Sequence, residues 1–449
     1  MLLFVTLAWL FSVSVPSQSP APDCATVDAC RAQALIAEAA GDFEQFHDLA
    51  WRAVQKGKAN NPELMVMLAR AMALSGRPGD AIVMLSRLAD MGVKVDASGD
   101  EFRVVRTLKD WPDVEAKLAA LTSPAVTDAA PPSKSAAAHD PAAAAARPSR
   151  PQPQEAESKA SEPKLTREVR SPETREPRNP AREPETPVLS FSAPASATSG
   201  LAYDAVSRRF VVSDRAAGRL MVIDEVSQHV VPLVSAAGAG FYDDVTAFRI
   251  DSRRGDLWVV SARNEDDHAE SVVHKLQLVS GRPIFEIKPA SFGDVRLVDV
   301  AVDDSGTVYV LDAADSRIFR VRPGARTLEL VTRTKIDQPT AFDVVDDRTA
   351  FVAGSAGLMR VDLGTGHVTH VESKTSFGAI ASVNVHGQSV FVLQQSSDGS
   401  QLVRCKLDRT GRAIKSIDVV DSASAIGRGG DKLYYLAAPG VIKSVRQQP

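Results

Sequence analysis

The stretch VDVAVDDSGTVYVLDAADSRIFRV, residues 298–321, alternates apolar and polar residues and carries five aspartates. A period of two interrupted by Asp-Asp-Ser-Gly predicts antiparallel β-strands joined by a tight turn. A similar strand recurs six times along the chain, as RFVVSD, DLWVVS, TVYVLD, TAFVAG, SVFVLQ and KLYYLA. Their centres are separated by 47, 51, 42, 40 and 43 residues, at Val211, Trp258, Tyr309, Phe351, Phe391 and Tyr434. Repeats of this length predict a six-bladed β-propeller over 188–449.

The ends of this repeat region predict how the ring closes. The last unit stops after its third strand, near Arg446. The segment VLSFSA at 188–193 can supply the missing outer strand, which would remove two exposed sheet edges.

Residues 24–121 have the apolar spacing of helices, with apolar residues recurring at three and four. Gly41 and Gly76 lie 35 residues apart, as do Gly57 and Gly92, which indicates an internal helix-turn-helix repeat. The final part, 100–121, is predicted to be a capping pair of helices.

Residues 122–187 hold 13 of the 27 prolines and no aromatic residue. With so little apolar surface to bury, this segment is predicted to be a disordered, Pro/Ala-rich linker. The predicted fold class is therefore multidomain α plus all-β: a short helical repeat domain, a disordered linker and a six-bladed β-propeller.

The N-terminal residues 1–17 predict export. They are apolar from Leu2 to about Val15 and then become small and polar, as in a signal peptide, although no Lys or Arg precedes the apolar run. The expected location is secreted or periplasmic. There Cys24 and Cys30 could form a disulfide before the first helix, unless that helix already includes both, which would place them on different faces.

Three resemblances to known families follow from particular residues. The segment 62–92 resembles a tetratricopeptide repeat in Leu68, Ala69, Gly76, Ala81 and Leu85. The opening stretch resembles the NHL repeat of six-bladed propellers, with Asp312, Arg317 and Ile318 at the strand end, the loop end and the next strand. Over 188–449 the chain resembles the wider superfamily of NHL and gluconolactonase-like propellers. The order of parts looks like that of exported bacterial proteins.

Most of the opening aspartates have a structural interpretation. Asp303, Asp304 and Gly306 fall in the predicted hairpin turn, where Asp bonds its own backbone and Gly takes a positive φ. The acidic turn recurs with Asp204, Asp251 and Asp346. Asp312 and Asp214 precede an arginine at a fixed offset (Arg317 and Arg219), which predicts an ion pair within the blade.

Asp299 opens an inner strand, at the expected mouth of the central channel, and Asp243 and Asp244 occupy a comparable place in the second blade. These three are the candidate ligand-binding residues. The loop ARNEDDHAE, 262–270, adds oxygen ligands, so Asp244, Asp299, Glu265, Asp266 and Asp267 form a candidate site for calcium or another divalent cation. The alternative is a solvated loop with polar residues lining the channel.

The resemblance to gluconolactonases implies a metal-dependent hydrolase, but two ligand positions of that family do not match. Ser199 stands where the family has Glu, and Pro339-Thr340 stands where it has Asn-Gly. His367 and His370 lie three apart, which on a strand points them to opposite faces. No catalytic residues are therefore assigned.

The expected function is that of an exported, non-catalytic binding or scaffold protein, which recognises protein or small ligands through the helical repeats and the upper face of the propeller. Protein or peptide partners are expected. Nucleic acid is not, because the formal net charge of −4 lacks the excess of basic residues that is typical of nucleic-acid binding. The alternative is a divergent metal-dependent lactonase or esterase.

Overall fold

The computed structural model describes residues 24–122, 188–192, 198–214, 217–265 and 268–446. The predicted signal peptide and nearly all of the predicted linker lie outside these residues. Among the residues described, no helix is long and apolar enough to cross a membrane.

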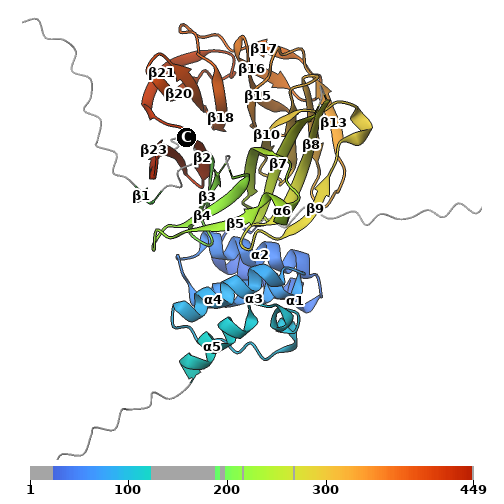
Figure 1. Cartoon of the computed structure of the whole chain (residues 1–449), viewed down its shortest axis with the longest axis vertical. Helices are drawn as coiled ribbons and strands as arrows, with labels where there is room; N and C mark the ends of the chain where they lie inside the picture. The colour runs from blue at the N-terminus through green and yellow to red at the C-terminus, as the bar shows by residue number, and fades with distance from the viewer. Residues whose placement is uncertain (1–23, 123–187, 193–197, 215–216, 266–267, 447–449) are drawn as a thin grey trace, which may run out of the picture. The chain divides into compact units, whose positions relative to one another are not determined.

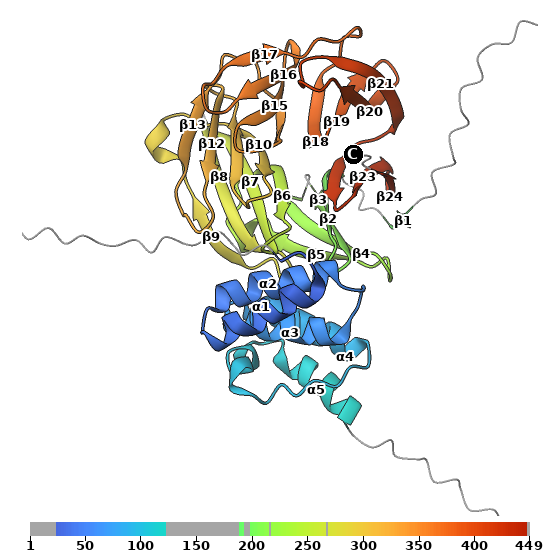
Figure 2. The same cartoon turned by 180° about the vertical axis from the view of Figure 1, so that it is seen from behind.

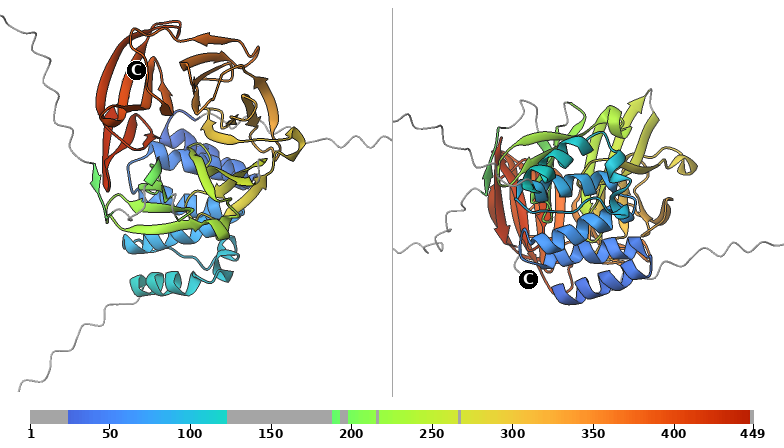
Figure 3. Two further views of the ribbon diagram at one scale, coloured as in Figure 1. Left: turned by 45° about the horizontal axis from the view of Figure 1, so that its top comes forward. Right: turned by 90° about the horizontal axis from the view of Figure 1, so that it is seen from below.

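In the part of the chain that the structure describes, the N-terminal region is a helical domain of five α-helices in which consecutive helices pack side by side, as the right-hand view in Figure 3 shows. Side chains of Thr26, Asp42 and Asn61 accept hydrogen bonds from backbone N–H groups at the starts of α1, α2 and α3, and prolines open α3 and α4. The helices are α1 (Val27–Ala39), α2 (Phe43–Lys56), α3 (Pro62–Leu74), α4 (Pro78–Asp90) and α5 (Trp111–Thr122).

The prediction of a capping helix pair over 100–121 is wrong in its first half. Residues Asp100–Phe102 and Val105–Thr107 form two short 3₁₀ turns, η1 and η2, and only α5 is an α-helix. The two valines, Val104 and Val105, have low helix propensity, and the segment is too short to offset the cost of starting a helix.

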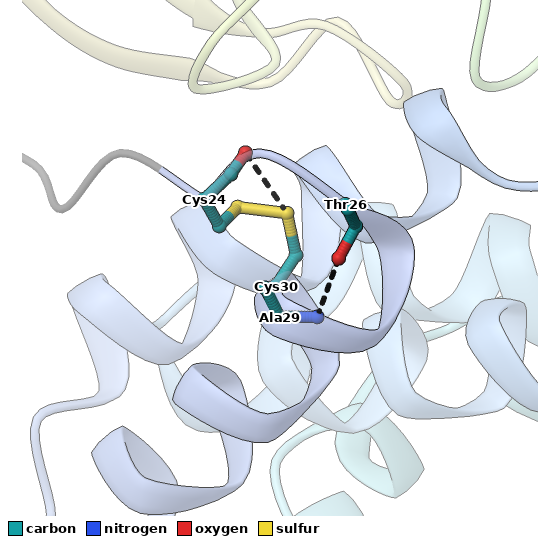
Figure 4. The surroundings of a disulfide bond; sticks show 4 residues. All are labelled: Cys24, Thr26, Ala29 and Cys30. Atoms are coloured by element: carbon teal, nitrogen blue, oxygen red, sulfur yellow. Dashed lines mark hydrogen bonds between the residues drawn. A yellow bond between two sulfur atoms is a disulfide. The ribbon is translucent and has the colours of Figure 1, made fainter.

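Cys24 and Cys30 form a disulfide at the start of α1 (Figure 4). The helix begins only at Val27, after the N-cap Thr26, so Cys24 lies in the preceding turn and its Cα comes within 5.0 Å of that of Cys30. Of the two alternatives for this pair, the bridged one is confirmed. Both half-cystines are buried, which makes the bridge part of the core of the helical domain.

The C-terminal part is a six-bladed β-propeller, as predicted, with four antiparallel strands in every blade. In Figures 1 and 2 the inner strands β10 and β18 face the centre of the ring and the outer strands β13, β17 and β21 lie at its rim. Blades 1 to 3 are β2 (Thr198–Asp204), β3 (Arg209–Asp214), β4 (Arg219–Asp224) and β5 (Val230–Ser235); β6 (Asp244–Asp251), β7 (Asp256–Glu265), β8 (His268–Gln277) and β9 (Pro283–Ile287); and β10 (Leu297–Val302), β11 (Val308–Asp312), β12 (Arg317–Val321) and β13 (Glu329–Arg333).

Blades 4 to 6 complete the ring. They are β14 (Ala341–Val344), β15 (Thr349–Gly354), β16 (Gly357–Asp362) and β17 (Val368–His370); β18 (Ile380–His386), β19 (Ser389–Ser396), β20 (Gly399–Leu407) and β21 (Ile414–Ser422); and β22 (Ile426–Gly429), β23 (Lys432–Ala438), β24 (Val441–Arg446) and β1 (Leu189–Ser190). A short helix α6 (Ala236–Ala239) and a 3₁₀ turn η3 (Ala290–Phe292) lie in connections. The predicted closure is confirmed, because β1 pairs with β24 and Leu189 lies opposite Ile442.

The local predictions for the opening stretch are also confirmed. Oδ1 of Asp303 accepts the N–H groups of Ser305 and Thr307, and Gly306 has a φ of +81°. Arg317 donates from Nε to Asp312 over 2.6 Å, and both side chains are buried. The equivalent pair in blade 1, Arg219 with Asp214, has the same contact at 2.9 Å.

The two parts of the chain share a contact that the sequence patterns do not predict. Within each blade, the turns that join the first strand to the second and the third strand to the fourth lie on one side of the propeller, which we call its lower face. The inner strands begin on the opposite side, which we call its upper face. Helices α2 and α4 pack against lower-face turns of blades 1 and 2, and one hydrophobic cluster runs from the helical domain into these blades. Trp51 of α2 donates its indole N–H to the carbonyl of Ser252 over 2.8 Å.

Candidate functional site: the channel inside the inner strands

A small cavity lies among the inner strands of the propeller. Its volume is about 100 Å³, below the roughly 300–1,000 Å³ of typical small-molecule sites. Residues of all six blades contribute to its wall, most of them small, apolar or hydroxyl-bearing; they include Gly200, Thr246, Asp299, Thr340, Ser382 and Ala425. Arg249 and Asp299 are the charged residues in this wall.

Asp299, the residue of the opening stretch predicted to bind a ligand, does line this cavity, and its carboxylate is held by three blades. Oδ1 accepts the N–H of Val300 over 2.8 Å, and Oδ2 accepts the N–H of Phe342 in blade 4 over 3.0 Å. Arg249 of blade 2 places Nη2 3.6 Å from Oδ1. Burial raises the pKa of Asp299, while Arg249 and the two N–H groups act in the opposite direction.

A second carboxylate repeats this arrangement one blade further on. Asp343 accepts the N–H of Val344 at Oδ1 and that of Val385 in blade 5 at Oδ2, over 3.0 and 2.7 Å. Arg428 of blade 6 donates to the same Oδ2 over 2.8 Å and to the carbonyl of Val385 over 2.6 Å. Each aspartate therefore ties its own inner strand to the next, and each has an arginine from a further blade.

The other predicted site residues are not among the described residues that line the cavity. Asp244 begins β6 and is half-buried, and the adjacent Asp243 is exposed; neither is among the residues that line the cavity. Asp266 and Asp267 lie outside the described residues, and the structure describes only the backbone of Glu265 at the end of β7. The ligand roles of these residues stay predictions.

The metal site implied by the resemblance to gluconolactonases does not fit the residues that the structure describes. No group of three or more His, Cys, Asp or Glu side chains lies close enough to share an ion among them. Thr340, at one of the mismatched positions, donates its hydroxyl to the carbonyl of Ile380 over 2.8 Å. Among the described residues near the cavity, the one carboxylate in the wall already accepts N–H groups, and the hydroxyl of Thr340 already donates to the backbone.

A serine and a histidine in blade 2 resemble part of a hydrolytic dyad, but they are inaccessible. Oγ of Ser261 lies 2.9 Å from Nε2 of His274 and accepts the N–H of Tyr242. Ser261 is 0% exposed and His274 is 1% exposed, and burial lowers the pKa of His274 to about 4. A neutral, buried imidazole bonded to a serine that itself supports the backbone is a structural pair.

Sequence reasoning missed the two arginines of the channel. Arg249 stands in AFRID and Arg428 in IGRGG, both inside inner strands and both between two apolar or small neighbours. A charged residue inside such a strand is the signal that could have identified them, because an unpaired charge there would be costly.

The comparisons with known proteins concern the propeller. No family model matches the chain, and no curated protein matches its sequence. A PQQ-bound aldose sugar dehydrogenase of Streptomyces coelicolor is 12% identical, with a TM-score of 0.43, over 60% of this chain and 99% of that one. A gluconolactonase of Xanthomonas campestris is 14% identical, with a TM-score of 0.44, over 58% of this chain and 88% of that one. At these identities the likeness is one of fold alone.

Proposed function

We propose that the protein is an exported, non-catalytic binding or scaffold protein, which uses surfaces of the helical domain and the upper face of the propeller. The observation that carries this proposal is the state of the Asp299 carboxylate. Both of its oxygens accept backbone N–H groups, and Arg249 lies beside it. A carboxylate held in this way stabilises the packing of three blades and has little freedom to act as a base or a metal ligand.

The size of the cavity supports the same proposal. A volume of about 100 Å³ admits only a few non-hydrogen atoms, such as the tip of a side chain from a partner. Enzymes that enclose a sugar or a lactone use larger pockets. The disulfide between Cys24 and Cys30 supports export, because such bonds persist in oxidising compartments.

The experiment is an assay of the purified full chain against a panel of lactones and esters, with and without a chelator. We expect no turnover above the buffer rate, and no difference between the natural protein and the Asp299→Ala variant. Asp304→Ala, which changes an exposed aspartate of the same blade, is the matched control. Hydrolysis that is lost with the chelator and with Asp299→Ala, but kept in Asp304→Ala, would establish the metal-dependent alternative.

Metal binding is checked in the same preparation by thermal unfolding in millimolar calcium or zinc. The proposal predicts no rise in Tm beyond that of a matched salt control, since a ligand that binds only the folded state raises Tm. A rise that disappears in Asp244→Ala would assign an ion to the predicted loop site.

A further inference from the structure

The contact between the helical domain and the lower face, which we call the docking contact, includes side chains of the helices that bond to backbone groups of the propeller. Trp51 and Gln55 of α2 both donate to the carbonyl of Ser252, over 2.8 and 2.6 Å. Oδ1 of Asp80 in α4 accepts the N–H of Ser280 over 2.9 Å. Arg87 donates to the carbonyl of Ser207, so the contact extends over blades 1 and 2.

The two surfaces approach closely enough to exclude larger side chains. A Cβ at Gly255 would lie 2.7 Å from the ring of Trp51, and the φ of +64° at Gly255 also favours glycine. A Cβ at Gly79 of α4 would likewise lie 2.5 Å from Cδ of Arg282 in the β8–β9 turn. Trp51 is 1% exposed, which means that the propeller covers an indole ring that the helical domain alone would leave open on this side.

Charged groups of both signs are enclosed at this contact. Four aspartates are buried, two from the helices and two from blade 2: Asp48, Asp80, Asp251 and Asp256. The cations that face them are Arg52 and Arg77 from the helical domain and Arg254 and Lys275 from blade 2. Glu44, whose side chain is exposed, also pairs with Arg77 and so shares that cation with the buried aspartates.

The pairing of these groups is uneven. Lys275 lies 2.6 Å from Asp256, whereas Arg77 is 4.0 Å from Asp256 and Arg254 is 3.6 Å from Asp48. Oδ2 of Asp80 and Nε2 of His47 are buried and have no hydrogen-bond partner among the described residues. Burying an incompletely paired carboxylate is costly, and protonation removes that cost.

We propose that the docking contact is a proton-linked latch: it holds the helical domain to the propeller without the connecting segment, its incompletely paired buried carboxylates take up protons, and His47 opposes that uptake.

The physical basis of the uptake is burial. It raises the pKa of Asp48 and that of Asp80 to about 6 each, and Arg254, Arg77 and the N–H of Ser280 offset only part of this effect. A carboxyl whose pKa is raised on docking favours docking as the pH falls through about 6, and this gain is complete below the ordinary value near 3.8.

His47 acts in the opposite direction. Burial lowers its pKa from 6.5 to about 3, with Arg77 adding to the effect and Asp256 and Glu44 opposing it. If undocking exposes this imidazole to water, its pKa returns to the ordinary value of 6.5, it is protonated below that pH, and docking must remove the proton. The contributions of His47 and of the two aspartates therefore nearly cancel between neutral and mildly acidic pH.

The test uses the full chain with a specific protease site inserted within 124–184. After cleavage, the affinity of the two pieces is measured at pH 7.5 and at pH 5, for example by sedimentation. We expect the pieces to stay associated, and the natural affinity to change by less than about tenfold between the two pH values.

The His47→Gln variant removes the opposing group. Each of the two aspartates with a raised pKa strengthens the association about tenfold between pH 7.5 and pH 5. The affinity between the two pieces of this variant should therefore be roughly a hundredfold higher at pH 5 than at pH 7.5. The Asp80→Asn variant, which keeps His47, should instead bind slightly more weakly at pH 5 than at pH 7.5. His367→Gln, an exposed histidine of the propeller, is the matched control and should behave as the natural protein.

Two results would overturn the proposal. One is separation of the pieces at both pH values once the chain is cut. The other is a pH response of His47→Gln and Asp80→Asn that equals that of the natural protein. Circular dichroism of each cleaved variant shows whether both pieces are folded, and either variant alone decides the sign of the proton linkage.

Discussion

Buried aspartates occur in two regions of this molecule, and the protein compensates them differently. In the channel, Asp299 has an N–H donor on each oxygen and Arg249 beside it. At the docking contact, Asp80 has a single backbone donor, from Ser280, and its second oxygen has no hydrogen-bond partner in the described residues. The comparison teaches that burial alone does not mark a site: the first aspartate ties blades together, and the second takes up a proton at an interface as the pH falls.

The largest expected effect concerns the apolar part of the docking contact. Trp51→Ala removes a ring that is buried against Gly255 and should destabilise the contact by about 3–5 kcal/mol, the usual cost of truncating a buried tryptophan. The affinity between the two pieces, after cleavage at the protease site within 124–184, measures this effect. Leu35→Ala, at a half-exposed position of α1, is the control and should leave the contact unchanged.

A smaller effect is expected in the channel. Asp343→Ala leaves the N–H of Val385 without its acceptor and Arg428 without its carboxylate, and should lower the free energy of unfolding by about 2–3 kcal/mol in urea. Asp343→Ala combined with Arg428→Ala should cost less than the sum of the two single changes. Strict additivity would show that the pair does not couple blades 4 and 6.

The repeated local patterns made most of the fold predictable. The strand spacing sets the number of blades, VLSFSA at 188–193 supplies the closing strand, and Asp303 and Gly306 specify the hairpin turn. These features depend on residues near one another in the chain, whose periodicity and turn chemistry are visible in one repeat. The two 3₁₀ turns were mispredicted because weak propensity in a short segment is decided by packing.

The sites were much less predictable than the fold. Asp299 was identified at the channel, but its partners come from other blades, at Phe342 and Arg249, and no local pattern connects them. Asp80 and Asp256 lie in a helix and a strand that are far apart in the chain, and they meet only because two surfaces dock. In the sequence, each is an ordinary polar residue.

The most direct test of the comparison is one paired measurement: the free energy of unfolding of Asp80→Asn and of Asp299→Asn against the natural chain at pH 7.5. The first substitution keeps an acceptor oxygen for the N–H of Ser280 and removes a charge, on a group whose pKa burial raises to about 6. This variant should therefore be more stable than the natural chain, by up to roughly 3 kcal/mol, with the gain vanishing below pH 4.

At position 299 the same substitution should be less favourable, because burial also raises the pKa of Asp299 but both of its oxygens accept N–H groups. An amide has one acceptor oxygen where Asp299 uses two, and its NH₂ group would face either the N–H of Phe342 or Arg249, at a cost of about 1–2 kcal/mol. We predict that Asp80→Asn is more stable than the natural chain at pH 7.5 and that Asp299→Asn is less stable than Asp80→Asn. A gain for Asp299→Asn that equals or exceeds that of Asp80→Asn would contradict this prediction.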